Sequence, residues 1–299
     1  MRYILKNPEP KVFETWKDTH AETLQEKYVG EKGDKIWDWF GKSYQVERDS
    51  LRESLLYEQG YICCYCGRSI DNSFPNAMEH FRAKGCEHHK KKIFDYQNLM
   101  ISCKCSELTE PSLIQFKVTQ GYENLETQNQ ISEKAGCSTK RLREWNPLLT
   151  QDPRKSITQL EEGDNLYLYI KHCDDKKEDI DIEEVNNQII NPIADVTLAD
   201  KFKYKIDGTI ELVELSETIK NNVLYHVLNL NAHNLCELRS QEVLAAEQDK
   251  KRLLQDFEKG IMTEDELIDE VNSQELPNEK NRRRPFCFIY SYVLKQLIS

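Results

Sequence analysis

Two cysteines separated by two residues, Cys63 and Cys66, are the first side chains whose type and spacing indicate chemistry. Gly67 follows at once, and glycine permits the positive φ angle of a tight turn that brings two thiolates together. Such a pair can grip Zn²⁺, which structural sites hold tetrahedrally with four ligands. Cys103 supplies another thiol further along the chain. The spacing therefore predicts a structural zinc site, and the alternative is a set of buried thiols.

The role of the cysteines depends on the redox conditions of the cell compartment. Ten cysteines in 299 residues would indicate disulfides in a secreted chain. The first ten residues, MRYILKNPEP, contain no signal-peptide core, and no run approaches the ~18 apolar residues of a membrane span. We therefore expect a cytoplasmic protein without a membrane partner, whose thiols bind metal.

Charge is distributed unevenly along the chain. The net charge of −11 argues against a whole surface that binds nucleic acid, and residues 161–184 are strongly acidic. Two basic runs flank the cysteine cluster, at 81–92 and 140–143, and either run taken alone would be interpreted as a solvated face. Together they indicate a local site for a phosphodiester, with Arg82, Lys84 and Lys140 as the candidate nucleic-acid contacts.

Three segments carry a resemblance to a known family. They read EQGYICCYCGR at 58–68, EHFRAK at 79–84 and YQNLMISC at 96–103. In this order they resemble the HNH (ββα-metal) endonucleases, and more narrowly the HNH nucleases of Septu and retron-linked phage-defence systems. LNLNAHNL at 228–235 and RRRPF at 282–286 also look like later motifs of that family. The resemblance runs in pieces over nearly the whole chain and is most specific in 57–103.

The resemblance implies roles for three side chains. His80 would be the general base that activates water, which suits an imidazole with a pKa near 6.5. Asn98 would orient that imidazole or brace the loop that carries it, although an isolated Asn is often a helix cap. Glu79 stands where related motifs have a metal-binding Asp, or it lies behind the metal ligands, because neighbours on a strand face opposite ways. A catalytic Mg²⁺ or Mn²⁺ is implied beside the structural zinc.

The fourth zinc ligand is the least determined of these residues. Cys137 lies in GCSTK, which looks like the family pattern C-[G/N]-x-x-K, so Cys103 and Cys137 are expected to complete the site. Cys105 is the alternative ligand. It is less favoured because the C-x-C spacing between Cys103 and Cys105 is shorter than the C-x-x-C spacing of paired zinc ligands. Ser138 replaces the His or Asn that follows the last cysteine in many HNH motifs, which leaves the third ligand of the catalytic metal unassigned.

The expected fold class is α+β and mostly helical, with a zinc-stapled ββα-metal finger embedded between helical regions. We expect an arm and helices in 1–60, the nuclease domain in 61–150, and a mixed then helical region in 151–299 that docks a partner. The finger would use strands at 61–66 and 77–82 and a helix that starts near Tyr96. A helix over 48–60 would end at Gly60, and Asp207-Gly208 would close a hairpin. Helices are expected at 216–229, 232–259, 263–273 and 286–298.

The function that the resemblance implies is a metal-dependent endonuclease of an antiphage defence system. It would cleave nucleic acid and act with an ABC-type ATPase, and a retron reverse transcriptase with its msDNA is a further candidate partner. The alternatives are a non-catalytic zinc module that binds nucleic acid and an adaptor for the ATPase. The intact Glu79-His80 and Asn98 favour the enzyme.

Overall fold

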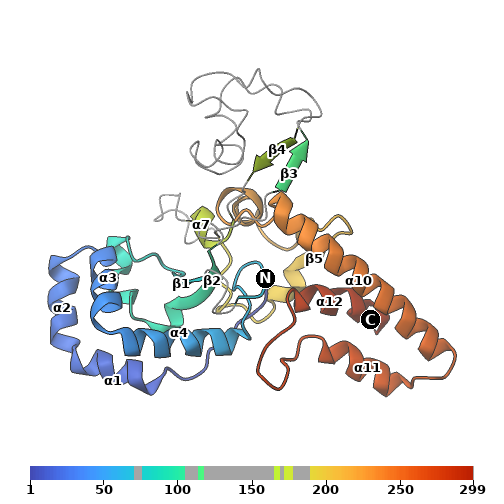
Figure 1. Ribbon diagram of the computed structural model, residues 1–299, viewed down its shortest axis with the longest axis horizontal. Helices are drawn as coiled ribbons and strands as arrows, with labels where there is room; N and C mark the ends of the chain where they lie inside the picture. Colours follow the sequence, from blue (N-terminus) through green and yellow to red (C-terminus); the bar gives the residue numbers. More distant parts are fainter. Residues whose placement is uncertain (71–75, 105–113, 118–164, 169–171, 178–188, 299) are drawn as a thin grey trace.

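The computed structural model describes residues 1–70, 76–104, 114–117, 165–168, 172–177 and 189–298 (Figure 1). These residues form an α+β fold with many helices and three small antiparallel two-stranded sheets, in line with the expected class. The main helices are α1 (Lys11–Thr19), α2 (Ala21–Gly30), α3 (Gly33–Ser43), α4 (Gln45–Gln59), α7 (Asp174–Lys177), α9 (Glu217–Asn221), α10 (His233–Glu258), α11 (Glu264–Ser273) and α12 (Cys287–Leu294). The strands are β1 (Asn76–His80), β2 (Leu99–Cys103), β3 (Ile114–Lys117), β4 (Asn165–Leu168), β5 (Phe202–Tyr204) and β6 (Ile210–Leu212). None of the described helices is both long and apolar enough to cross a bilayer.

The elements gather on two sides of a central seam. Helices α1 to α4 lie on one side, around β1 and β2, and α10 to α12 lie on the other side (Figure 1). The amino-terminal segment runs between them, and the Ile4 amide donates to the carbonyl of Pro192. A continuous hydrophobic cluster reaches from Met1 to Leu294. It includes Cys63, Cys64 and Cys66 of the loop 61–70, which is called the knuckle below. The two sides therefore share one core.

The sheet that carries the EHFRAK and YQNLMISC segments differs from the expectation. β1 pairs with β2 in antiparallel register, with His80 opposite Leu99 and Asn76 opposite Cys103. The helix expected from Tyr96 is instead a single 3₁₀ turn followed by strand β2. The strand expected at 61–66 is a loop whose one ladder contact joins Ile62 to Ser69. All five residues of β2 are buried, so the segment has no polar side that would reveal its period.

Local signals at two glycines are confirmed. Helix α4 ends at Gly60, which takes the left-handed conformation, with φ 68°. Leu51, Leu55 and Leu56 form its fully buried face, as their spacing predicts. The Asp207-Gly208 turn joins β5 to β6, and Gly208 has φ 77°. A side chain on Gly208 would also overlap the backbone of α10, since a Cβ would lie 1.8 Å from the carbonyl oxygen of Cys236.

The carboxy-terminal helix packs in the chain's own core. Seven residues of α12 are buried, and Phe288 lies so close to Gly67 that a Cβ there would be 2.0 Å from its ring. The Arg-rich segment before it pairs with the knuckle, because the Arg283 amide donates to Gly60 and the Phe286 amide donates to Gly67. These contacts place the helix in the core of the chain and leave little of it exposed for docking a partner.

A buried glutamine joins α4 to the knuckle and to β2. Gln59 is 1% exposed, and its amide nitrogen donates to the carbonyls of Ile62 and Ile101, both at 2.9 Å. Its carbonyl oxygen accepts from the Ile101 amide at 2.7 Å. Because buried backbone groups need partners, this one side chain satisfies polar atoms that the irregular loop would otherwise leave unpaired.

We predict that Gln59→Ala lowers the free energy of unfolding by about 3 kcal/mol, because it leaves buried backbone groups without partners. Chemical denaturation followed by circular dichroism measures this change. Gln45→Ala is the matched control, since Gln45 is an exposed residue of the same helix that bonds Asp49, and its effect should stay within about 0.5 kcal/mol. Equal losses in the two variants would contradict the bracing role of Gln59.

Candidate functional site

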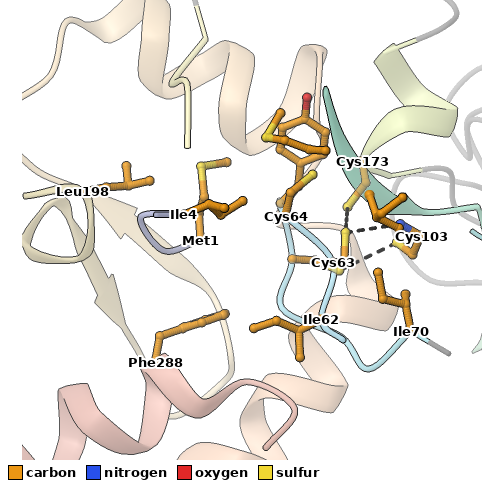
Figure 2. Packing of buried hydrophobic residues seen from close by; sticks show 14 of the residues in the cluster. Met1, Ile4, Ile62, Cys63, Cys64, Ile70, Cys103, Cys173, Leu198 and Phe288 are labelled. Carbon is orange, nitrogen blue, oxygen red and sulfur yellow. Dashed lines mark hydrogen bonds between the residues drawn. The ribbon is translucent and has the colours of Figure 1, made fainter. Parts of the chain in front are cut away.

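Four buried thiols converge beside the β1–β2 sheet. The sulfur atoms of Cys63, Cys66, Cys103 and Cys173 all lie within 4.8 Å of one another. None of these residues is more than 2% exposed, and all four are free thiols. Figure 2 shows Cys63 facing Cys103 and Cys173, with the apolar side chains of Ile62, Ile70 and Met1 around the knuckle.

The spacing of the sulfur atoms fits a tetrahedral zinc ion. Zn–S bonds of ~2.3 Å at tetrahedral angles separate the ligand sulfurs by about 3.8 Å. The Sγ atoms of Cys66 and Cys103 are 3.8 Å apart, and those of Cys63 and Cys173 are 4.0 Å apart. A four-thiolate set is the composition that closed structural zinc sites use, so these residues fit Zn²⁺ in both chemistry and geometry.

Hydrogen bonds prepare the cluster to carry negative charge. Burial by itself raises the pKa of the Cys63 thiol, but hydrogen bonds from Cys103 and Cys173 outweigh burial and hold its pKa well below the usual range. The Cys103 amide also donates to Cys63 Sγ at 3.3 Å. Burial raises the pKa of Cys173. His172 Nδ1 lies 3.2 Å from the Cys173 sulfur and orients it.

Three distant segments bring these thiols together. Gly67, with φ 76°, turns the knuckle so that Cys63 and Cys66 share one side, as the spacing predicts. Cys103 is the last residue of β2. Cys173 directly precedes α7, and the Asp174 amide donates to Ser102 Oγ at 3.4 Å, which fixes this segment against the end of β2.

The fourth thiol of the described cluster is one that the sequence reasoning missed. Cys173 stands in HCDDKK, which has neither a partner cysteine at short spacing nor a turn glycine. The adjacent His172 is the one local signal that could have drawn attention to it. Cys137 and Cys105 lie outside the described residues, as does Lys140, and their roles stay predictions.

His80 is the last residue of β1. One nitrogen of its ring forms a hydrogen bond, and the other keeps a free lone pair. It is 4% exposed, and its Nε2 lies 3.1 Å from the carbonyl oxygen of Ile93. A carbonyl can only accept, so Nε2 carries the hydrogen and Nδ1 keeps its lone pair. Among the described residues, Nδ1 has no hydrogen-bond partner. Burial, followed by the charge of Lys84, lowers the pKa of His80 to about 3. The imidazole is therefore neutral near pH 7, and it is a weaker base than the expected pKa near 6.5 would make it.

Glu79 belongs to a buried ionic network. Tyr65 donates to its Oε1 at 2.7 Å, and the Lys177 ammonium pairs with the same oxygen. Lys177 also donates to the carbonyls of His80 at 2.9 Å and Phe81 at 3.1 Å. Burial alone would raise the pKa of Glu79, but Lys177 and a side-chain bond with Asp174 lower it to about 2. Lys177 therefore ties the chain on both sides of His80 to α7.

Asn98 braces the loop that follows His80. Its side-chain oxygen accepts from the Arg82 amide at 2.6 Å, and its nitrogen donates to the carbonyls of Arg82 and Lys92, each at 3.0 Å. These bonds correspond to the second of the two roles that the resemblance implies for Asn98. They close the loop 81–98 at its base, and that loop supplies the Ile93 carbonyl that fixes the His80 ring.

His80 and Glu79 both line a pocket of about 730 Å³. Its walls come from α3, α4, β1 and α7, and from the loop after β1. The lining includes five cationic side chains, Arg48, Arg52, Lys84, Lys104 and Lys177, and four acidic ones, Asp34, Asp38, Glu79 and Asp174. Lys84, one of the predicted nucleic-acid contacts, pairs with Asp34 at 3.5 Å. Arg82 is half-buried with its guanidinium over the Phe81 ring, and it does not line the pocket.

The arrangement offers a neutral imidazole with a free nitrogen, a pocket lined in part by cationic groups, and a nearby cluster of four thiols that could hold a metal ion. Such a site can take a proton from water or from a hydroxyl next to an anionic substrate. Comparison with known proteins adds no assignment, because neither a family model nor a curated protein matches the chain.

We predict that each chain binds one Zn²⁺ and that Cys173 is a ligand. Cys173→Ala should weaken zinc binding more than ~10–100-fold. A loss of ~10–100-fold is typical when a residue that only supports a metal ligand by a hydrogen bond is mutated. Competition with a chromogenic chelator measures the affinity, and the absorption of the Co²⁺-substituted protein reports the number of thiolates. Cys64→Ala is the control, since Cys64 is buried beside the cluster but is not part of it. Zinc binding that survives Cys173→Ala but is lost in Cys137→Ala would contradict this assignment.

We also predict that Lys177→Met destabilises the fold by about 3–5 kcal/mol, because it leaves the Glu79 carboxylate buried without its counter-charge. Lys176→Met, at the half-buried neighbouring position, should have little effect. Because the pKa of Glu79 is depressed to about 2 from 4.5, its contribution in the wild type is full above pH 4.5 and is lost as the pH falls towards 2. Denaturation at pH 7 and at pH 3 measures both effects, and equal stability of the two variants at pH 7 would refute the role of Lys177.

Proposed function

We propose that this protein is a zinc-braced endonuclease that hydrolyses phosphodiester bonds, with His80 as the general base. The observation that carries the proposal is the state of the His80 ring. Its Nε2–H is held by the Ile93 carbonyl, its Nδ1 is available, and it lines a pocket that also contains cationic side chains. The resemblance of the EHFRAK and YQNLMISC segments to HNH nucleases supports the same reaction.

The chain's own residues would act as follows. Nδ1 of His80 accepts a proton from a water molecule, and the oxygen of that water forms a bond to phosphorus while the bond to the leaving oxygen breaks. The leaving oxygen keeps the electron pair of that bond and takes a proton from solvent. The hydrogen bond to Ile93 becomes stronger as the ring gains charge. Lys84 and Arg48 stabilise the negative charge that develops on the phosphoryl oxygens. Lys177 and Asn98 act through the backbone, because they hold the segment on either side of His80 in place.

A catalytic Mg²⁺ or Mn²⁺ remains part of the proposal through the resemblance. When bound, such an ion neutralises phosphoryl oxygens and the leaving group. In the described part of the chain, however, the thiol cluster is the one group of three or more potential ligands that converge. Glu79 is already engaged by Tyr65 and Lys177. No step is therefore assigned to the catalytic ion, and an assay with and without it decides the requirement.

The partner belongs to the proposal in the same way. The resemblance implies that an ABC-type ATPase of the same antiphage defence system controls the nuclease, with a retron reverse transcriptase and its msDNA as a further candidate. The net charge of −11 supports a controlled enzyme, since an acidic chain binds nucleic acid weakly by itself.

We predict that His80→Ala lowers cleavage of nucleic acid by ~10²–10⁴-fold, as the loss of a general base does. Purified protein is assayed on DNA and RNA, with Mg²⁺, with Mn²⁺ and with EDTA. It is assayed both alone and after co-expression with the ABC-type ATPase that the resemblance implies. His89→Ala provides the control, since His89 lies in the same basic loop but does not line the pocket. Zinc content verifies that the site scaffold is intact. Activity of His80→Ala within about tenfold of wild type would exclude His80 as the base.

A further inference from the structure

We propose that the pocket above His80 accepts unpaired nucleotides and excludes the continuous double helix, an inference that rests on the proposed function. The ligand class is single-stranded DNA or RNA, or an unpaired stretch within a duplex. The inference comes from the depth of His80, the walls around it, the ring of Trp37 and the balance of charge in the pocket.

The depth of His80 sets the first constraint. A general base must come within ~2.6–3.2 Å of the proton that it removes, directly or through one water. His80 is only 4% exposed, so the scissile phosphate has to enter the pocket. Stacked base pairs hold the phosphates of a duplex on the outside of a stiff cylinder. By analogy with enzymes that reach a base only in a single strand or after extruding the nucleotide, a recessed centre of this kind favours a flexible strand. The pocket volume of about 730 Å³ lies in the range of ~300–1,000 Å³ that holds small ligands.

The wall over His80 is packed against the loop that follows it. Gly33, at the start of α3, lies so close to this loop that a Cβ would be 1.8 Å from the Lys84 carbonyl oxygen. Further along α3, Trp37 is held by Phe40 and Phe94, with ring centroids 5.4 and 5.7 Å away. An aromatic core therefore fixes this wall, and a duplex would have to break these contacts to reach His80.

Trp37 supplies an aromatic surface next to the proposed base. Its ring meets the His80 ring edge to face, with centroids 4.4 Å apart and an interplanar angle of 85°. Trp37 is half-buried and lines the pocket. Every nucleobase has a π face, and stacking on an aromatic side chain contributes ~1–3 kcal/mol per base. A paired base has both faces occupied by its neighbours, so this contact selects an unpaired one.

The balance of cationic and acidic side chains in the pocket also favours a single strand over a duplex. A protein that binds a duplex neutralises phosphates along the helix, for example with ~6–10 contacts. Here five cationic side chains are offset by four acidic ones, and two of the cations, Lys84 and Lys177, already have carboxylate partners. Within the described residues, Arg48 forms no ion pair. This set is suited to one or two phosphates of a flexible strand rather than to the two phosphate rows of a helix.

Binding to the His80→Ala protein, in which we expect cleavage to be lost, tests the proposal directly. Fluorescence anisotropy compares a labelled single strand of DNA, the RNA of the same sequence, the fully paired duplex, and a duplex with a central unpaired bubble. We expect the single strands and the bubble to bind at least about tenfold more tightly than the duplex, which corresponds to ~1.4 kcal/mol. The two single strands show whether the sugar matters.

Variants of the stacking residue provide the second arm. In the His80→Ala background, Trp37→Ala should weaken single-strand binding by about 5–150-fold, which is the loss of one stacked base. Trp37→Phe keeps an aromatic face and should retain most of the affinity. Trp39→Ala is the matched control, because Trp39 is a half-buried tryptophan of the same helix that packs on Trp16 and Tyr44 and does not line the pocket.

The outcomes separate this inference from the proposed function. Duplex binding or cleavage equal to that of the single strand, or single-strand binding that is unchanged in folded Trp37→Ala, overturns the inference while the nuclease assignment stands. Binding of single strands that depends on Trp37 supports the inference. If the wild-type protein binds single strands in this way but cleaves none of the substrates, the nuclease assignment is refuted and the inference about binding stands.

Discussion

The contact among four thiols is the constraint on which the rest of the fold depends. Cys63 and Cys173 are separated by 110 positions in sequence, yet their sulfurs are 4.0 Å apart. The cluster joins the knuckle, the end of β2 and the start of α7, and each of these segments carries a part of the candidate site. Four buried thiols without a metal would gain little from meeting, whereas Zn²⁺ binding in such sites supplies folding free energy outright. The position of His80 follows from this junction, because α7 reaches β1 through Lys177.

The sequence reveals local features of this arrangement more readily than distant ones. The C-x-x-C spacing with Gly67, the end of α4 at Gly60 and the Asp207-Gly208 hairpin are all set by backbone conformation over a few residues, so their patterns predict them. β2 was expected to begin a helix because its five residues are buried on both faces and show no alternation. Apart from the adjacent His172, Cys173 has no local signature. Its place depends on tertiary closure, as do the pairing of Lys177 with Glu79 and the packing of Trp37 against His80.

The candidate site brings together several polar and charged groups whose burial costs free energy. A buried imidazole kept neutral, a carboxylate and an ammonium in contact, and a cluster of thiols all lie around the β1–β2 sheet. Each of these groups would destabilise the fold without its partner. Their mutual satisfaction explains why the surrounding backbone can be irregular. The loop 81–98 contains 3₁₀ turns rather than long elements, and it is held by the side chain of Asn98 and by the carbonyl that receives His80.

The location of Cys173 has a further consequence for how the chain can vary. The polypeptide leaves the cluster at Cys103 and returns to it at Cys173, and β3 and β4 pair with each other between these points. The two ends of the intervening chain therefore meet at the same thiol cluster. The entropy of closing a loop grows only with the logarithm of its length, so that doubling it costs only ~0.6 kcal/mol. Segments of very different length could therefore be accommodated between the two thiols while the knuckle, the sheet and the pocket keep their geometry.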